Sequence, residues 1–237
     1  MLPPRDASTV IVARDTDAGI EVYMLRRSSR SPAVPDAYVF PGGTIDNNDK
    51  SPQARMRIAG QWRPAEPAFT YAAIRETFEE CGILFAVKAI PLERLREARS
   101  LMLEGKRSFS ETLIDLDTQL DARAVRYFSR WITPPVVQHR FDARFFVSRV
   151  PAGQIPEADA FETYDGRWIR PADMIAEAQR DAVQLIFPTF KHLERVGQFA
   201  TVDELLAFAD TKKTIPVTPD VRAGPTFLLP PTLENTW

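Results

Sequence analysis

Three glutamates in the stretch Tyr71–Ile83 have the type and the spacing to hold a metal ion. Glu76, Glu79 and Glu80 stand at positions i, i+3 and i+4, so on a helix they are neighbours on one face. Carboxylates this close repel one another, and Arg75 supplies only one positive charge, spaced to reach Glu79 four residues on. The remaining negative charge suits a hard divalent cation, whose natural ligands are carboxylate oxygens. The alternative is a solvated acidic helix face.

The same stretch carries the apolar residues that a helix needs for packing. At about 100° per residue, the stripe opposite the glutamates contains Tyr71, Ile74, Phe78 and Cys81. Pro67 can open this helix and Gly82 can end it, which predicts a helix over Ala68–Cys81. The only cysteine lies on the apolar stripe, so it is interpreted as a buried structural thiol rather than a nucleophile.

Together with Phe40-Pro-Gly-Gly43 upstream, these residues resemble the signature motif of the Nudix hydrolases. Gly43 corresponds to the first glycine of that motif, and its second half corresponds to Arg75, Glu76, Glu79, Glu80, Gly82 and Ile83. The chain departs from the motif in having Asp49 at the early glutamate position and Thr77 at an aliphatic one. In addition, 25 residues separate Asp49 from Arg75 where the motif has seven, so the motif contains an insert. This resembles the long-motif subgroup that includes peroxisomal coenzyme A diphosphatases.

The resemblance implies the Nudix α/β/α sandwich, an α/β fold with a mixed sheet between helices. It also implies hydrolysis of a diphosphate bond by water that Mg²⁺ or Mn²⁺ activates. Glu76, Glu79 and Glu80 would be metal ligands with the Gly43 carbonyl, and Arg75 would orient the cluster by pairing with one carboxylate. The general base would be Glu80 or Glu79. A late acidic residue, Glu162 or in reserve Asp165, would be an extra ligand or base.

The substrate is open at this stage. Arg27-Ser28 and Phe40-Pro-Gly-Gly43 match a signature of coenzyme A-cleaving Nudix proteins, but Pro32 and Asp36 replace its second arginine and its glycine. Arg30 lies two residues from the replaced arginine. Coenzyme A or acyl-coenzyme A is therefore predicted, and ADP-ribose, NADH or another nucleoside diphosphate is the alternative. A Nudix-like ligand sensor without catalysis is a further alternative. The residues predicted to bind substrate are Arg27, Arg30, Phe40, Gly42 and Arg140.

The hydrophobic patterns predict the elements around this site. Strands are expected over 8–14, 20–27, 37–40, 83–89, 125–132, 140–148 and 161–169. Helices are expected over 92–104, near 110–116, and over 172–180, 185–196 and 201–209. The insert, about residues 47–66, is basic and aromatic through Arg55, Arg57, Trp62 and Arg63. It is interpreted as a surface excursion, with a phosphate clamp or a base-stacking role as the alternative.

Composition bounds the class of protein. A chain of 237 residues with 44% apolar and 26% charged residues is predicted to be one globular domain over 1–237, ending in a helical extension and Pro-rich tail over about 171–237. The net charge of −2 gives no basic field for nucleic acid, and no apolar run is long enough to span a membrane. Without a signal peptide or a peroxisomal Ser-Lys-Leu tail, the chain is predicted to be cytoplasmic. A small-molecule nucleotide is the expected partner, and the resemblance allows a homodimer.

Overall fold

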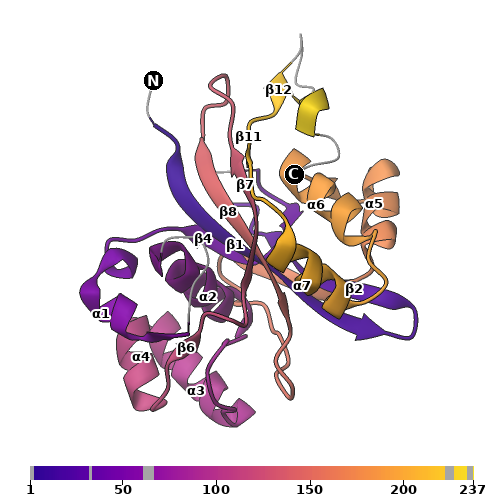
Figure 1. Ribbon diagram of the computed structural model, residues 1–237. Coiled ribbons are helices and arrows are strands. Elements are labelled where there is room, and N and C mark those ends of the chain that lie inside the picture. The colour runs from indigo at the N-terminus through magenta and orange to yellow at the C-terminus, as the bar shows by residue number, and fades with distance from the viewer. Residues whose placement is uncertain (1–2, 32–33, 61–66, 222–226, 234–236) are drawn as a thin grey trace.

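The computed structural model describes residues 3–31, 34–60, 67–221, 227–233 and 237. Its centre is a mixed sheet with the strand order β10-β3-β2-β1-β8-β7-β11, in which β4 also pairs with β1 and β9 with β2 (Figure 1). These strands are β1 (Arg5–Thr16), β2 (Gly19–Arg27), β3 (Ala37–Val39), β4 (Gly42–Thr44), β7 (Arg126–Ile132), β8 (Phe141–Arg149), β9 (Thr163–Ile169), β10 (Gln184–Leu185) and β11 (Pro216–Val217).

Helices cover both faces of this sheet (Figure 1). On one side lie α1 (Pro52–Met56), α2 (Pro67–Cys81), α3 (Leu92–Leu103) and α4 (Phe109–Asp115), and on the other α5 (Pro171–Gln179), α6 (Phe187–Val196) and α7 (Val202–Thr211). Two-stranded pairs join β5 (Ile58–Ala59) to β6 (Leu120–Asp121) and β12 (Asp220–Val221) to β13 (Phe227–Leu228). Short 3-10 turns lie at Asn48–Lys50 and Pro231–Leu233. The predicted α/β/α sandwich with a mixed sheet is confirmed.

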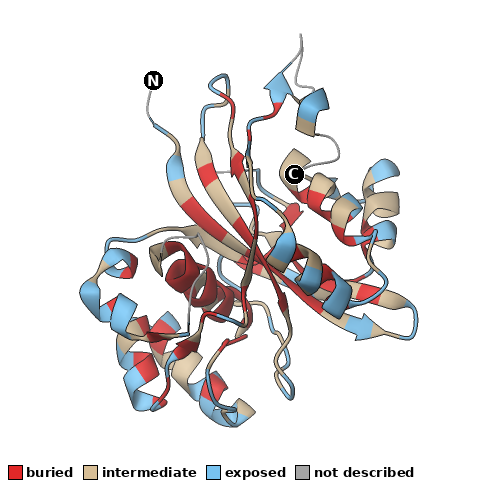
Figure 2. Ribbon diagram, viewed as in Figure 1, coloured by how far each residue is buried: buried red, intermediate tan, exposed pale blue. Residues whose placement is uncertain are grey.

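The side chains of β1 explain why both faces are covered. Val10 and Val12 belong to the core on the α2 side, whereas Ile11 and Ala13 belong to the core on the α6 side. Because successive side chains of a strand point to opposite faces, an uninterrupted apolar run needs packing on both. Figure 2 shows the resulting buried layers, one on either side of the sheet.

Residues 83–89 do not form the predicted strand. Ile83, Leu84 and Phe85 are buried as expected, but their only ladder contact is an isolated bridge between Ala86 and Leu120. The Gln154 side chain accepts a hydrogen bond from the Leu84 N–H at 2.8 Å and donates one to its carbonyl at 2.9 Å. A side-chain amide therefore satisfies backbone groups that a neighbouring strand would otherwise pair, which the sequence pattern could not reveal.

Most described residues of the insert are exposed, as the interpretation as a surface excursion expects, but two of its apolar side chains reach the core. Ala54 of α1 and Ile58 of β5 are buried in the core on the α2 side, and β5 pairs with β6. The predicted clamp residues Arg55 and Arg57 lie here, and Arg55 is exposed. Trp62 and Arg63 lie outside the described residues.

A buried histidine anchors the α6 side of the sheet. His192 has no exposed surface and stacks on Phe145 with ring centroids 4.0 Å apart. Its Nδ1 lies 2.6 Å from the Pro188 carbonyl, which can only accept, so Nδ1 carries the proton and Nε2 accepts from the Ser129 hydroxyl at 2.6 Å. Burial lowers the pKa of His192 to about 3, and the nearby positive charge of Lys212 acts in the same direction.

Acidification is expected to destabilise the protein through His192. Its pKa is lowered from 6.5 to about 3 on folding, so the unfolded chain binds more protons between these values. The stabilisation is therefore complete above pH 6.5 and is lost as pH falls toward 3, by about 2 kcal/mol between pH 7 and pH 5. Urea unfolding at both pH values measures this loss. His192→Gln should flatten the dependence by that amount, and an unchanged dependence in the variant would contradict the prediction.

Candidate active site

Helix α2 carries the glutamates, and it is buried more completely than the sequence indicates. Tyr71, Ile74 and Phe78 pack in the core as predicted. Thr77 is also buried, and its hydroxyl donates to the Ala73 carbonyl at 2.7 Å, as a hydroxyl on a helix can. Glu80 is only 7% exposed. The alternative of a solvated acidic helix face therefore does not hold for α2, because the sheet, the insert and α3 surround this helix.

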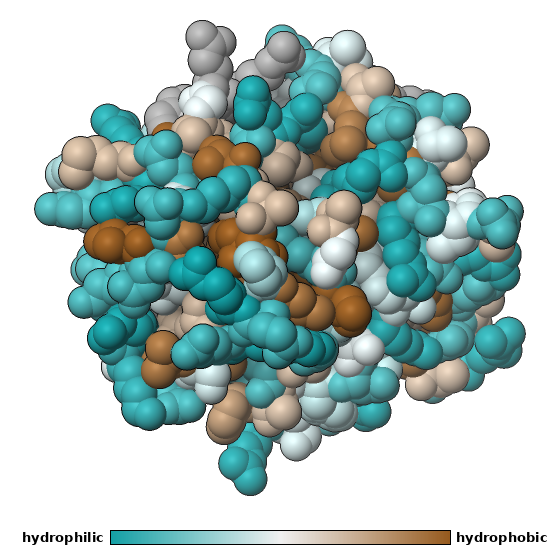
Figure 3. All heavy atoms as spheres, turned by 90° about the horizontal axis from the view of Figure 1, so that it is seen from below, coloured by the Kyte–Doolittle hydropathy of each residue, from teal (hydrophilic) through white to brown (hydrophobic). Residues whose placement is uncertain are grey.

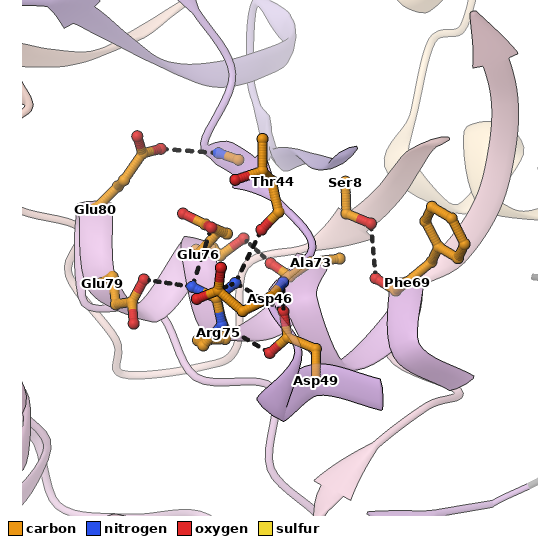
Figure 4. Close-up of polar contacts among 12 residues, drawn as sticks. Ser8, Thr44, Asp46, Asp49, Phe69, Ala73, Arg75, Glu76, Glu79 and Glu80 are labelled. Atoms are coloured by element: carbon orange, nitrogen blue, oxygen red, sulfur yellow. Dashed lines mark hydrogen bonds and ion pairs between the residues drawn. The ribbon is translucent and has the colours of Figure 1, made fainter. Parts of the chain in front are cut away.

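Arg75 organises one half of the site by binding acidic groups from two elements (Figure 4). Its Nε and Nη2 donate to the two oxygens of Asp49 at 2.9 and 2.8 Å, a bidentate pair. Its Nη1 donates to Glu79 at 2.8 Å and lies 3.0 Å from a Glu76 oxygen. Nη2 also reaches the Thr44 carbonyl at 3.1 Å. Arg75 thus joins α2 to the insert and to β4, and the expectation that it pairs with a carboxylate is met.

Asp49 has a structural role in this arrangement. Its side chain is fully buried between Arg75 and the Asp46 backbone N–H, which donates to it at 2.8 Å. The acidic residue at the early motif position therefore fixes the loop and the guanidinium together. The departure from glutamate at this motif position therefore leaves the loop and the guanidinium in contact.

The Gly42-Gly43 pair defines the other half of the site. The Gly42 N–H donates to Glu80 Oε2 at 2.8 Å (Figure 4). A Cβ on Gly42 would lie 2.3 Å from the Ser8 carbonyl oxygen, and one on Gly43 would lie 2.5 Å from the Glu76 carboxylate. A Cβ on Gly42 would collide with the backbone of β1, so glycine is needed there, whereas a Cβ on Gly43 would have to displace the Glu76 carboxylate.

Gly43→Ala is expected to lower hydrolytic activity by about 10- to 100-fold. The added methyl group has to displace the Glu76 carboxylate, which it would otherwise approach to 2.5 Å. Because Gly43 has no left-handed backbone requirement, the protein should remain folded. Steady-state kinetics with thermal unfolding as the companion measurement checks this. Wild-type kinetics in the folded variant would mean that the position of Glu76 is unimportant.

The carboxylates of α2 are held in an environment that disfavours negative charge. Burial raises the pKa of Glu76 to about 8, against the opposing attraction of Arg75. Burial likewise raises the pKa of Glu79, and it raises that of Glu80 well above its usual range, with the neighbouring Glu76 charge adding to the effect. A cation bound between such groups would relieve both the repulsion and the loss of hydration.

Arg27 and Glu162 are brought to the same place from distant parts of the chain. Arg27, at the end of β2, is half-buried, and that burial lowers its pKa while the charges of Glu80 and Glu162 raise it. The negative charge of Glu162 also raises the pKa of Glu76. The Glu162 carbonyl accepts from the Ser28 N–H at 2.8 Å, which ties the loop before β9 to the end of β2.

Asp159 is a residue of this site that sequence reasoning missed. One of its oxygens accepts from three successive backbone N–H groups, those of Phe161, Glu162 and Thr163, at 2.7 to 3.0 Å. Asp159 therefore shapes the turn that presents Glu162, and its negative charge adds to the raised pKa of Glu80. An aspartate two to four residues ahead of its N–H partners is a turn signal that could have been noticed.

The other predicted residues stand at different places in the fold. Phe40 is buried in the core on the α6 side, where its ring meets His192 edge-on at 6.4 Å. Arg30 is exposed in the loop after β2. Arg140 lies just before β8 and donates to the Thr133 carbonyl at 3.2 Å. Asp165, the second candidate for the late acidic residue, accepts a hydrogen bond from the Tyr38 hydroxyl. Its carboxylate therefore links β9 to β3.

The donor set fits a hard divalent cation. Among the described residues, no three acidic, histidine or cysteine side chains lie close enough together to form a ready-made metal cluster. Glu79 is turned to Arg75 while Glu80 is turned to the Gly42 N–H, which separates these two carboxylates (Figure 4). The charge of Glu76 nevertheless acts on Glu80 and raises its pKa, and both carboxylates lie beside the Gly42-Gly43 backbone. Hard oxygen donors of this kind suit Mg²⁺ or Mn²⁺.

Known proteins resemble this chain in both sequence and fold. The acyl-coenzyme A diphosphatase NUDT19 of Xenopus laevis is 26% identical over 273 residues, covering 86% of this chain and 72% of that protein. The protein of the same name from Gallus gallus is 27% identical, covering 89% and 71%. The crystal structure of a NUDIX hydrolase from Alicyclobacillus acidocaldarius superposes with a TM-score of 0.78 at 28% identity, covering 87% of this chain and 97% of that one.

The family assignment follows from these matches and from the site itself. The family model described as the NUDT19 Nudix domain matches residues 53–196, which is more than half of the chain. This range contains α2, most of the insert, and the loop that carries Asp159 and Glu162. Nudix hydrolases generally use divalent metals, as the carboxylates of α2 would require. This chain therefore belongs to the Nudix hydrolase family, in the group represented by the NUDT19 Nudix domain.

Proposed function

We propose that this protein hydrolyses the diphosphate bond of coenzyme A or acyl-coenzyme A, using Mg²⁺ or Mn²⁺. The main support is the match to the NUDT19 Nudix domain, since relatives in that group are named acyl-coenzyme A diphosphatases. A second support is the cationic Arg27 next to Glu80 and Glu162, where a diphosphate beside the carboxylates would meet a positive charge.

The backbone at Asp36 also supports the coenzyme A reading. Asp36 takes the place of a signature glycine, and its φ of +61° lies in the left-handed region that glycine favours. Its carboxylate accepts from Arg26 at 3.1 Å and from the Tyr164 hydroxyl, contacts that hold this unusual conformation. The glycine-like turn is thus retained without glycine. The other departure from the signature, Pro32, lies outside the described residues.

In this proposal, Glu76 and Glu80 would hold the metal with the Gly43 carbonyl, and Glu79, which pairs with Arg75 here, would be a further ligand. The bound ion would neutralise charge on the phosphate oxygens and make water nucleophilic at neutral pH. Arg75 keeps α2 and the insert in register through Asp49. Glu162 is presented by the Asp159 turn and is the candidate to accept a proton when Glu80 is occupied as a ligand.

Product analysis by mass spectrometry tests this function. Purified protein is incubated with coenzyme A, an acyl-coenzyme A, ADP-ribose and NADH in the presence of Mg²⁺ or Mn²⁺, and Glu80→Gln serves as the inactive control. We expect release of 3′,5′-ADP from coenzyme A or its acyl ester, dependent on metal and lost in the variant. Cleavage of ADP-ribose or NADH alone would overturn the substrate assignment and leave the hydrolase. Binding of coenzyme A without cleavage would favour a ligand sensor.

A further inference from the structure

Arg99 differs from the other polar side chains of α3. This helix is described along its whole length, and Arg99 is the only one of its polar residues that is not exposed. The others lie in water, on a side of the molecule where polar groups surround short apolar patches, as Figure 3 shows from the side on which α3 lies in Figure 1. Burial lowers the pKa of Arg99, because a guanidinium loses hydration there. A partner inside the protein has to compensate for this loss.

That partner is the last turn of α2. The Nε and Nη2 groups of Arg99 both donate to the Glu79 carbonyl, at 3.0 and 2.8 Å. The last four carbonyls of a helix have no partner within it, so groups outside the helix must satisfy them. Gly82, with a φ of +75°, ends the helix and leaves room for the guanidinium, since a Cβ there would lie 3.4 Å from Arg99 Nη1. Arg99 therefore caps α2 at a residue that carries one of the candidate metal ligands.

The charges at this end of α2 explain why the cap is cationic. The carboxyl end of a helix is the negative end of its dipole, so acidic side chains in the last turn are unfavourable. Glu79 and Glu80 stand side by side in that turn and are turned apart, Glu79 to Arg75 and Glu80 to the Gly42 N–H (Figure 4). A guanidinium at the Glu79 carbonyl offsets the dipole and fixes the backbone from which both carboxylates project.

The same arginine also interacts with the loop that presents Glu162. Burial lowers the pKa of Arg99, whereas the negative charges of Asp159 and Glu157 raise it. The Glu157 N–H donates to the Cys81 carbonyl at 3.0 Å, so this loop caps a second free carbonyl of α2. Asp159 in turn holds the turn that presents Glu162. Arg99 thus lies where the end of α2 meets the loop that carries the late acidic residue.

We infer that Arg99 is a positioning residue for metal binding, which fixes the last turn of α2 against this loop so that the carboxylates keep the arrangement that one ion requires. The inference rests on the proposed function, which assigns a metal to these carboxylates. Arg99 acts through the Glu79 backbone rather than through a carboxylate. Replacing a residue that orients metal ligands from outside the ligand set typically lowers metal affinity or activity by about 10- to 100-fold.

The test measures Mn²⁺ binding to the folded protein without substrate, by electron paramagnetic resonance, at a temperature below the unfolding transition of each variant. Arg99→Met keeps an apolar stem and removes the donors. We expect its dissociation constant for Mn²⁺ to be about 10- to 100-fold higher than that of the wild-type protein. A merely structural role would lower the unfolding temperature and leave this constant unchanged.

Arg94→Met is the matched control. Arg94 lies on the same helix and also donates to a backbone carbonyl in the last turn of a neighbouring helix, that of Asp115 in α4, at 2.9 Å. Because α4 carries no candidate ligand, this variant should bind Mn²⁺ as the wild-type protein does.

Arg99→Lys is the second test variant. Lysine keeps a charged donor at the end of α2 but cannot form two parallel hydrogen bonds. Its Mn²⁺ affinity should therefore lie between those of the wild-type protein and Arg99→Met. Should Arg99→Met fail to fold, weaker Mn²⁺ binding by Arg99→Lys than by Arg94→Lys supports the inference, and equal binding overturns it.

The outcomes separate this inference from the proposed function. Wild-type Mn²⁺ affinity in Arg99→Met overturns the role of Arg99 and leaves the proposed hydrolase standing. A loss confined to the Arg99 variants supports that role even where no nucleotide is cleaved, a result that would overturn the proposed reaction alone. A wild-type protein that binds no Mn²⁺ would overturn both.

Discussion

Replacing Glu80 by glutamine is expected to lower the rate of diphosphate hydrolysis by about 10²- to 10⁴-fold while the protein stays folded. Glu80 is the α2 carboxylate that accepts a hydrogen bond from the Gly42 N–H, at 2.8 Å, and the positive charge of Arg27 attracts it. Glutamine keeps an oxygen that can accept from Gly42 but loses the charge that a metal ion requires. The chemistry should therefore fail while the local backbone geometry remains.

The stability of this variant provides the companion measurement. Burial raises the pKa of Glu80 well above its usual range, so the metal-free fold bears a cost for holding this group as a carboxylate. Glu80→Gln should leave the free energy of unfolding unchanged or raise it by about 1 kcal/mol. Glu97→Gln, on the exposed face of α3, controls for a change of net charge. If Glu80→Gln kept more than a tenth of the wild-type rate, Glu80 would be neither ligand nor base.

Replacing Arg75 by alanine is expected to destabilise the protein by about 3–5 kcal/mol. The guanidinium is buried, and its removal leaves the fully buried Asp49 carboxylate without its bidentate partner. Glu79 and Glu76 lose their ion pairs at the same time. Activity should fall as well, because the insert and α2 are no longer held in register. Urea unfolding measures the stability, and steady-state kinetics without urea measures the activity.

A double-mutant cycle with Asp49→Asn isolates the contact that matters. If Arg75 acts mainly through Asp49, the two substitutions together should cost much less than the sum of their separate effects. Arg107→Ala serves as the control, since its ion pair with Asp115 is exposed and should contribute less than about 1 kcal/mol. An additive cycle would show that Arg75 stabilises the fold independently of the insert.

Much of the candidate active site could be predicted from the sequence. The spacing of Glu76, Glu79 and Glu80 on a helix is a local property, and so are the helix bounds set by Pro67 and Gly82. The flanking motif indicated the family, and membership of that family predicted the sandwich fold. Local periodicity also predicted α3, α5 and α7 closely, because amphipathic helices encode their buried side in residues three and four apart.

The tertiary structure decided what each of these groups touches. Asp159 and Glu162 reach the carboxylates of α2 only because the loop before β9 folds back over the end of β2. Leu84 has no strand partner because the Gln154 side chain, 70 positions away, takes both of its backbone hydrogen bonds. No local pattern specifies such partners, since their sequence separation is set by the path of the whole chain.

The sequence by itself determined the chemistry that this protein carries, through residue types at fixed spacing on one helix and one glycine pair. Only the tertiary structure decided which carboxylate is turned to Arg75 and which to Gly42. The physical reason is that helix spacing is fixed by short-range geometry, whereas burial and charge environment arise from contacts between segments far apart in the chain.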